Sequence, residues 1–349
     1  MNVSKFLPAG ARFVRARLLV LLILPACAAL AQSAPPTVIA HRGASGYVPE
    51  HTLEAKAYAH ALGADFLEQD LVLTKDDVPV VLHDIHLDTV TDVAQKFPQR
   101  KRADGRFYAL DFTLAEVKQL KVTERFNAKT GEPVFPKRFP AHRSTFQIST
   151  LEEELQLIEG LNRSTGRKVG IYPEIKQPKW HRVQGHDISR VVLPLLHKYG
   201  YATKADPCFL QCFELAEVRR LRNELGWRGR LVMLTEAKAV GADGTDYAAL
   251  STAAGLRDLA TVADGIGPAI SRIVTWNAAG QPTFTDLVAL AHAEKLVVHP
   301  YTIRTDELPK HCPSSDALHS ALFKESRIDG VFTDFTDVTL AWLRAAKVR

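Results

Sequence analysis

Short apolar runs rich in β-branched residues alternate along the chain with longer stretches in which apolar residues recur at helical spacing. The short runs predict eight strands, at Thr37–Ala40, Phe66–Leu73, Val169–Ile175, Cys208–Phe213, Arg230–Leu234, Gly265–Gly267, Leu296–Tyr301 and Gly330–Thr333. Helices are predicted after most of these strands, at Thr52–Leu62, Ile188–Tyr199, Leu215–Leu225, Phe284–Glu294, Ala317–Phe323 and Thr336–Ala346. Eight strands that alternate with helices predict an α/β fold, a closed parallel TIM (β/α)8 barrel over residues 37–349.

One long segment breaks this alternation. After Val80–Asp84, the chain from about 91 to 146 is polar, basic and proline-rich, and it predicts only one helix, near Thr113–Leu120. We interpret it as a surface insertion at the ligand-facing end of the barrel. We expect the cationic side chains of this segment to be exposed to solvent, as in an ordinary surface loop. The alternative is that they narrow the access to a binding site and favour anions. These cations are Lys96, Arg100, Lys101, Arg102, Lys137, Arg138 and Arg143.

The N-terminal segment has a different pattern. Lys5 and three arginines precede the apolar run Leu18–Leu24, and Ala29–Ala31 supplies the small residues that a signal peptidase accepts. The run is shorter than the roughly 20 apolar residues of a spanning helix, and Pro25 follows it. We therefore predict a cleaved signal peptide at 1–31 and a periplasmic or secreted mature chain. A lipoprotein cleaved before Cys27 is the alternative.

Composition and charge narrow the class of protein. The 349 residues are 46% hydrophobic and 24% charged, which is typical of a globular chain. The net charge of +5 includes four cations of the N-terminal segment, so the rest carries only +1. This balance predicts no partner among nucleic acids and no stable membrane insertion. Cys208, Cys212 and Cys312 are an odd number that cannot pair completely within one chain, and a framework of several disulfides is not needed at this size. Cys208 and Cys212 are expected to be small buried residues, the alternative being a metal or redox pair.

Charged pairs interrupt two of the apolar strands. Glu68 and Asp70 are two residues apart, as are Glu174 and Lys176, so each pair shares one face of its strand. Such charges are costly inside a barrel unless they meet at a ligand or an ion. We therefore predict a metal site of Glu68, Asp70 and Glu174 beside Lys176. Oxygen ligands favour Ca²⁺ or Mg²⁺, and the export signal favours Ca²⁺.

Two histidines stand at the ends of strand-like segments, where barrel enzymes place catalytic groups. His41 and Arg42 end the first strand, and His83 ends the run Val80–Leu82. Because histidine titrates near neutral pH, one imidazole can act as general base and the other as general acid, in either order. Arg42 can hold a phosphate through two parallel hydrogen bonds. Together these groups predict metal-assisted cleavage of a phosphodiester.

Three further residues are weaker candidates. Asp334 follows the last strand, where it would either orient a catalytic group or cap the next helix. Tyr301 closes a strand and is a candidate for lining the substrate pocket. The histidines outside the two strand ends, His51 among them, are expected to be structural.

With these residues in place, the sequence resembles the glycerophosphodiester phosphodiesterase family, most closely its exported bacterial branch. The matching motifs run in family order: His41–Gly43, Pro49–Thr52, Glu68–Asp70, His83–Asp84, Thr150–Glu153, Glu174–Lys176, Gln211–Phe213 and Gly330–Asp334. The resemblance implies the TIM barrel with a small inserted region and the same site. That site comprises a divalent metal on Glu68, Asp70 and Glu174, the acid–base pair His41 and His83, and substrate contacts from Arg42, Lys176, Phe213 and Tyr301.

Two positions depart from the family motifs. His51 stands where asparagine is usual, and Cys212 stands where serine is usual. Neither is a predicted metal ligand, but both are expected to adjust the wall of the pocket.

The family's reaction is hydrolysis of a glycerophosphodiester to sn-glycerol 3-phosphate and an alcohol, and this is the function that the resemblance implies. Three alternatives stay open: a phospholipase D-like action on lysophospholipids, an exported phosphodiester-binding protein without turnover, and a surface-exposed structural or host-interaction protein. The sequence carries no prediction of oligomeric state.

Overall fold

The computed structural model describes residues 1–4, 10, 35–143 and 145–349. The chain divides into two units, residues 1–34 and 35–349. The apolar run, the cleavage motif and Cys27 of the predicted signal peptide lie outside the described residues. Among the helices that the structure does describe, none is long and apolar enough to cross a membrane.

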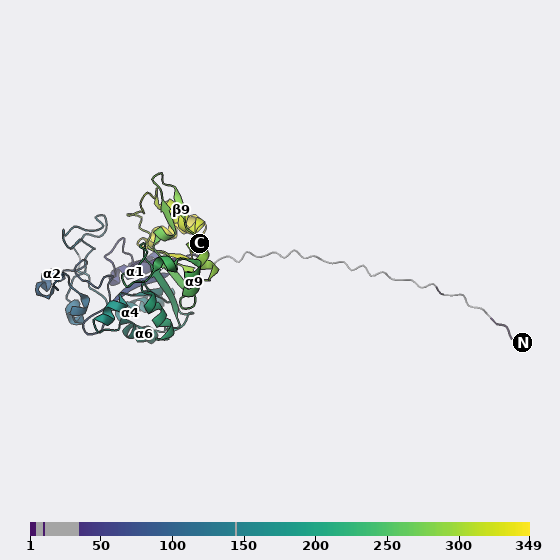
Figure 1. Cartoon of the computed structure of the whole chain (residues 1–349), viewed down its shortest axis with the longest axis horizontal. Helices are drawn as coiled ribbons and strands as arrows, with labels where there is room; N and C mark the ends of the chain where they lie inside the picture. The colour runs from purple at the N-terminus through teal and green to yellow at the C-terminus, as the bar shows by residue number, and fades with distance from the viewer. Residues whose placement is uncertain (5–9, 11–34, 144) are drawn as a thin grey trace. The chain divides into compact units, whose positions relative to one another are not determined.

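Eight parallel strands form the wall of the second unit (Figure 1). Each strand of the barrel pairs with the next one along the chain, except for the last two, and the first strand also pairs with the last, as in a TIM barrel. The predicted fold class is therefore confirmed. The strands are β1 (Thr37–Ala40), β2 (Phe66–Leu73), β4 (Gly170–Ile175), β5 (Phe209–Cys212), β6 (Arg230–Thr235), β7 (Gly265–Pro268), β10 (Val297–Val298) and β11 (Gly330–Thr333).

The barrel closes between β10 and β11 through irregular backbone. Asp329 N donates to Val298 O at 3.1 Å, Phe332 N to Pro300 O at 3.0 Å, and Ile303 N to Phe332 O at 2.9 Å. The prediction of a strand over Leu296–Tyr301 is wrong beyond Val298, because Pro300 has no N–H to continue a ladder.

Helices cover the outside of the sheet, and Figure 1 labels α1, α4, α6 and α9 among them. The prediction missed four of them, α4, α5, α8 and α9, although Thr150 and Glu153 form a capping box before α4. The helices are α1 (Leu53–Leu62), α4 (Leu151–Thr165), α5 (Pro178–Val183), α6 (Ile188–Lys198), α7 (Leu215–Asn223), α8 (Tyr247–Leu250), α9 (Ala253–Leu259), α10 (Leu287–Ala293), α11 (Ser315–His319) and α12 (Thr336–Ala345).

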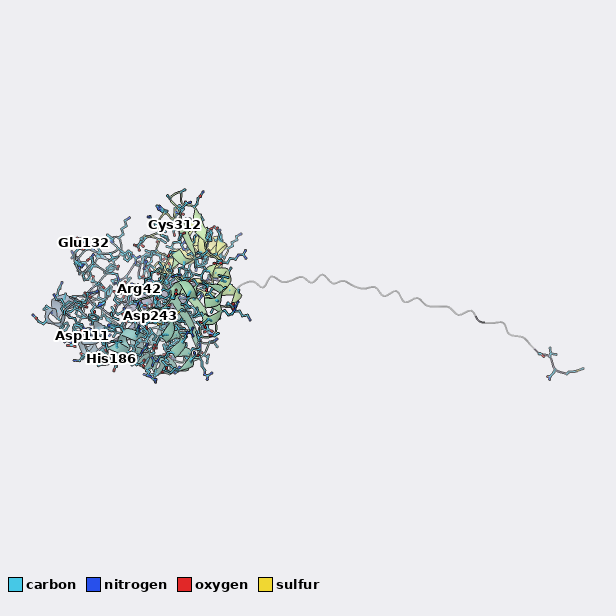
Figure 2. All side chains as sticks on the ribbon, viewed as in Figure 1. Arg42, Asp111, Glu132, His186, Asp243 and Cys312 are labelled. Atoms are coloured by element: carbon cyan, nitrogen blue, oxygen red, sulfur yellow. The ribbon has the colours of Figure 1, made fainter. Side chains whose placement is uncertain are left out.

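A second small sheet lies between β7 and α10. β8 (Val274–Trp276) and β9 (Pro282–Phe284) pair antiparallel as a hairpin. The helix predicted from Phe284 therefore begins only at Leu287. Cys208 and Cys212 are buried as predicted, Cys312 is buried as well, and all three are free. Figure 2 labels Cys312 in the upper part of the folded unit.

The segment 91–146 has a core of its own. β3 (Pro79–Val81) runs antiparallel to β2, and α2 (Val93–Lys96) and α3 (Leu114–Val117) follow it. Figure 1 shows α2 at the left edge of the folded unit and β9 near its top. The segment packs on apolar residues that do not belong to the main core: Val72, Val80, Leu82, Ile85, Leu87, Val90, Val93, Phe107, Ala109, Phe112, Val117, Leu120, Val122 and Ile148.

The last residue of the chain returns to the amino ends of the first strands. The Arg349 guanidinium donates to Pro36 O at 3.3 Å and to Asp65 Oδ1 at 2.7 Å. Asp65 precedes β2, and its Oδ2 accepts Val38 N of β1 at 2.8 Å. Both ends of the second unit therefore lie at the amino ends of the strands.

Candidate active site

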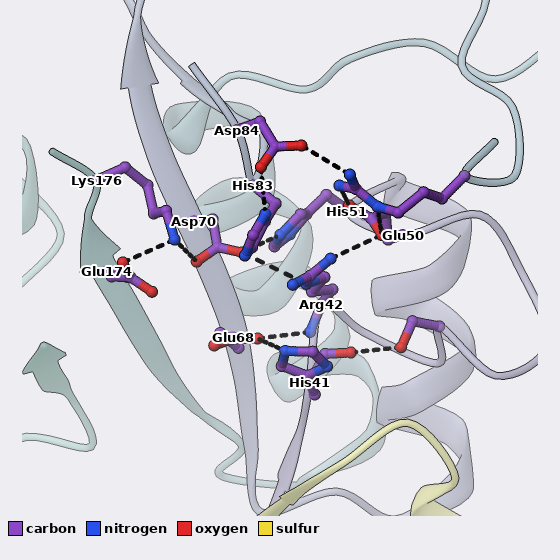
Figure 3. Close-up of polar contacts among 12 residues, drawn as sticks. His41, Arg42, Glu50, His51, Glu68, Asp70, His83, Asp84, Glu174 and Lys176 are labelled. Atoms are coloured by element: carbon purple, nitrogen blue, oxygen red, sulfur yellow. Dashed lines mark hydrogen bonds and ion pairs between the residues drawn. The ribbon is translucent and has the colours of Figure 1, made fainter. Parts of the chain in front are cut away.

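Three carboxylates meet at the carboxyl ends of β2 and β4. The two strands pair in parallel with Asp70 opposite Glu174, and Glu68 lies on the same face of β2 as Asp70. All three side chains are buried, and one ligand oxygen from each lies within 4.8 Å of the others (Figure 3). Strand register alone therefore assembles an oxygen site for a cation.

The electrostatics of this cluster fit a divalent cation. Burial raises the pKa of Glu68 and of Glu174, and it outweighs the nearby positive charges that oppose this shift. Lys176 Nζ lies 2.9 Å from Glu174 Oε1. Asp70 Oδ1 is buried with no hydrogen-bond donor among the described residues, and Lys176 Nζ is 3.8 Å away. A hard cation would satisfy this oxygen and stabilise the ionised carboxylates.

A left-handed turn at the end of β1 aims Arg42 at the same place. Arg42 has φ 57° and Gly43 φ 88°, and a Cβ on Gly43 would lie 2.8 Å from the Ala55 carbonyl carbon, so glycine is required. The turn directs Arg42 N to Glu68 Oε2 at 2.8 Å, and Nη1 donates to Glu50 Oε2 at 2.8 Å. Within the described chain Arg42 Nε makes no hydrogen bond, although Asp70 Oδ2 lies 3.7 Å away, so this N–H remains a candidate donor for a phosphate oxygen.

His41 is held by a carboxylate from the end of β11. Its Nδ1 lies 2.6 Å from Asp334 Oδ1, and Asp334 Oδ2 accepts from Arg138 Nη2 at 2.8 Å and from Arg304 Nε at 2.9 Å. Burial alone would raise the pKa of Asp334, but His41 and the two arginines bring it well below its ordinary value. Because the ionised carboxylate accepts the Nδ1 proton, Nε2 is left for the cavity, 3.8 Å from Glu68 Oε2.

His83 has a matching set of partners. Its Nδ1 lies 2.8 Å from Asp84 Oδ1, and Asp84 Oδ2 accepts from Arg125 Nη1 at 2.7 Å. Desolvation, followed by the positive charges of Arg42 and Lys176, lowers the pKa of His83 to about 4. The imidazole is therefore neutral at pH 7, and its Nε2 is free to accept a proton. Figure 3 shows Arg42 between His41 and His83.

Two arginines of the segment 91–146, Arg125 and Arg138, bind the carboxylates that hold the two histidines. The Arg138 side chain is only 4% exposed and the Arg125 side chain 16%, so the solvated-loop interpretation is wrong for Arg138. Arg125, which sequence reasoning missed, also donates to Glu50 Oε1 at 2.6 Å. No spacing in the sequence connects it to that partner. Four of the other predicted loop cations are exposed as expected: Lys96, Lys101, Lys137 and Arg143.

His51 contacts the carboxylate cluster, contrary to the expectation of a merely structural role. Its Nε2 lies 2.7 Å from Asp70 Oδ2, and its Nδ1 lies 3.2 Å from Lys56 Nζ. Lysine only donates, so Nδ1 accepts and Nε2 carries the proton given to Asp70. Burial and Lys56 lower the pKa of His51 to about 3, which keeps it neutral. Histidine thus supplies a neutral donor where the family motif usually has asparagine.

Two adjoining cavities open beside these groups. The first, here called the catalytic cavity, has a volume of about 430 Å³, and its lining includes both histidines, the carboxylate cluster, Arg42, Phe213 and Tyr301. The second cavity, of about 540 Å³, shares His83, Glu174 and Phe213 with the first and continues past Lys176 to Trp180. The Tyr301 hydroxyl donates to Thr235 O at 3.1 Å, so its ring rather than its hydroxyl faces a ligand.

Comparisons with known proteins place the chain in one family. Residues 41–338 match the model of the glycerophosphoryl diester phosphodiesterase family. A glycerophosphodiester phosphodiesterase of Haemophilus influenzae is 43% identical over 328 residues, which cover 89% of this chain and 90% of that protein.

Two solved structures share the fold. A protein of Silicibacter pomeroyi has a TM-score of 0.67 at 24% identity, with 90% of this chain and 95% of that chain covered. A phosphodiesterase of Oleispira antarctica in complex with the product sn-glycerol 3-phosphate has a TM-score of 0.58 at 21% identity, with 89% and 97% covered. At these identities the two structures support the fold alone.

Proposed function

Because this chain belongs to the glycerophosphoryl diester phosphodiesterase family, we propose that it hydrolyses glycerophosphodiesters to sn-glycerol 3-phosphate and an alcohol. A curated relative that matches over most of its length is an enzyme of this name, so the chain is an enzyme, and the alternative of a binding protein without turnover is not supported. The observation that carries the proposal is that both histidines and the carboxylate cluster line one cavity. The name of the Haemophilus influenzae relative, which is 43% identical, supports the glycerophosphodiester as the substrate class.

In this proposal Glu68, Asp70 and Glu174 hold a divalent metal, Ca²⁺ in preference to Mg²⁺. When bound, the metal would polarise a phosphate oxygen and neutralise the charge that develops around phosphorus. Arg42 Nε and the Lys176 ammonium bind the remaining phosphate oxygens.

The two histidines move the protons. One imidazole takes the proton of the neighbouring glycerol hydroxyl as that oxygen attacks phosphorus, and the other gives a proton to the departing alcohol oxygen. The cyclic phosphate is then opened by water, with the two rings exchanging roles. Asp334 and Asp84 hold the Nδ1–H group of each ring, so that Nε2 meets the substrate.

The test is an assay on glycerophosphocholine with and without EDTA. We expect equal amounts of sn-glycerol 3-phosphate and choline, loss of activity in EDTA, and better recovery with Ca²⁺ than with Mg²⁺. Release of phosphocholine and glycerol would contradict the proposed position of the cleaved P–O bond. Activity that survives EDTA would contradict the proposed metal dependence. In Glu174→Gln, metal addition should restore little activity, because one ligand charge is lost.

A lysophospholipid is a second candidate substrate. The second cavity includes apolar residues beside its charged ones, and Val183 in its lining is 75% exposed. It would suit a hydrocarbon chain if the glycerol half of the substrate, in place of the alcohol half, lay there. Choline release from lysophosphatidylcholine at a kcat/KM equal to or above that for glycerophosphocholine would favour this candidate, and absence of release would exclude it.

We further propose that the chain is exported. The charged start, the apolar run Leu18–Leu24 and the small residues Ala29–Ala31 support this proposal. Sequencing the N-terminus of the mature protein tests it. A start at Gln32 is expected, a lipid-modified Cys27 would favour the lipoprotein alternative, and an intact Met1 would contradict export.

A further inference from the structure

The second cavity has a wall of aromatic rings and carboxylates. It joins the catalytic cavity at His83, Glu174 and Phe213, so one ester group of a phosphodiester held at the carboxylate cluster can extend into it. Its lining includes the aromatic residues Trp180, Phe213 and Tyr247 and the acidic residues Glu214, Glu236 and Asp243.

Glu214 is the acidic residue of this wall that lacks a side-chain partner. It is 8% exposed, and its Oε2 accepts Lys179 N at 2.9 Å. Across the described residues, its Oε1 has no hydrogen-bond donor, and no lysine or arginine forms an ion pair with it. By contrast, Glu236 pairs with Lys238 at 2.9 Å, and Asp243 Oδ2 accepts the Thr245 hydroxyl at 2.6 Å.

The cations around this cavity are already bound elsewhere. Lys176 Nζ lies 2.9 Å from Glu174 Oε1, Lys179 Nζ donates to Asp243 O at 3.0 Å, and Arg182 pairs with Glu217. Burial raises the pKa of Glu214 to about 7. The Lys179 amide and the charge of Arg182 oppose this shift only in part, and no lysine or arginine of the described residues forms an ion pair with Glu214. A positive ligand group at this wall would stabilise the ionised carboxylate.

We propose that the second cavity is the subsite for the leaving alcohol and that it selects a cationic amino alcohol, whose ammonium group lies between Glu214 and the aromatic rings. An ammonium group is attracted both by a buried carboxylate and by the faces of aromatic rings. A neutral alcohol of similar size would leave the carboxylate without a counter-ion. The inference rests on the proposed function, since it names the alcohol class for that reaction.

The test variant is Glu214→Gln, because the amide oxygen can still accept Lys179 N while the charge is removed. The substrates are glycerophosphocholine and glycerophosphoethanolamine, with glycerophosphoglycerol as the neutral substrate. We expect kcat/KM to fall about 10-fold for the two cationic substrates, mainly through KM, and to change less than about twofold for glycerophosphoglycerol.

The matched control is Glu224→Gln, at the other end of α7, where the side chain is 59% exposed. It should leave all three substrates unaffected, and both variants should keep the wild-type melting temperature. Equal losses on cationic and neutral substrates in Glu214→Gln, or no loss on any of them, would overturn the subsite.

Choline binding to the metal-loaded protein, measured by calorimetry, separates this inference from the proposed function. Weaker choline binding in Glu214→Gln than in wild type supports the subsite even if no glycerophosphodiester is cleaved, an outcome that would overturn only the function. Equal choline binding by the two proteins would overturn the subsite whatever the turnover.

Discussion

The surroundings of His41 and His83 contain the same kinds of groups in opposite settings. Each imidazole has a carboxylate on Nδ1 and an arginine behind that carboxylate. Around His41 the side chains are buried, at 8% exposure for the histidine and 2% for Asp334. Around His83 the corresponding values are 32% and 28% for the histidine and Asp84.

The difference comes from the parts of the chain that supply each histidine. His41 and Asp334 follow the paired strands β1 and β11, so the barrel fixes both of them. His83 and Asp84 lie on the connection after β3, and Arg125 of the segment 91–146 holds them from the far side. A partner lost near His83 can be replaced by water, whereas a partner lost near His41 leaves buried charge behind. The two halves of the acid–base pair should therefore differ in their tolerance of substitution.

The largest expected effect comes from removing the imidazoles themselves. His41→Ala and His83→Ala should each lower kcat on glycerophosphocholine by about 10² to 10⁴, the usual contribution of an acid–base group. Circular dichroism should show an intact fold in both. Near-normal turnover of both variants would remove the pair from the mechanism.

Replacing the partner carboxylates should separate the two settings. Asp334→Asn should lower kcat by about 10² to 10³, because it disturbs the tautomer of a buried ring and removes the carboxylate charge that Arg138 and Arg304 share. Asp84→Asn should cost about 10-fold, since His83 and Asp84 are partly exposed, at 32% and 28%, and water can replace part of the lost contact. Equal losses measured on the same substrate would show that exposure does not distinguish the two sites.

The arginines behind the carboxylates should affect stability more than they affect chemistry. Arg138→Gln should lower the free energy of unfolding by about 2 kcal/mol, because a buried charge on Asp334 loses one of its partners. Arg102→Gln is the control in the same segment, where a 33% exposed pair with Asp111 should be worth less than about 1 kcal/mol. Urea unfolding of the wild type and the two variants measures the difference. Similar losses of stability in both variants would argue against a structural role for the buried Arg138–Asp334 pair.

The smallest expected effect is a change in the pH dependence of stability. The folded pKa of His83 is about 4, below the roughly 6.5 of an unfolded histidine. Between these values the unfolded state binds more protons, so this contribution is complete above about pH 6.5 and is lost as the pH falls towards 4. In EDTA, the unfolding free energy of His83→Asn should therefore rise less steeply with pH over this range than that of the wild type. The difference in slope should correspond to at most about one bound proton. An unchanged slope would contradict a depressed pKa.

The barrel was predictable because its signals are local. Seven of the eight strand predictions agree with the structure to within a residue or two at each end, since continuous apolar runs mark strands that are buried on both faces. The period of two along a strand likewise places Glu68 and Asp70 on one face from their spacing alone. The α4 helix was missed although the motif Thr150–Glu153 is itself a start signal.

The features that could not be predicted from the sequence depend on contacts between distant parts of the chain. Arg125 and Arg138 meet Asp84 and Asp334 across 41 and 196 residues, and no periodicity encodes such pairs. The neutral state of His51 likewise depends on Lys56 and on burial, which only the packed structure reveals. The small apolar core of the segment 91–146 was hidden for the same reason, because its members come from several short turns.

The position of Arg349 bears on how the protein can be handled. Because the folded unit starts and finishes beside Asp65, at the base of the strands, a tag joined to the C-terminus would leave from the surface opposite the mouth of the barrel. A resin or sensor chip coupled through such a tag would leave the mouth facing the solution. Immobilised enzyme should then hydrolyse small diesters with the same KM as enzyme in free solution.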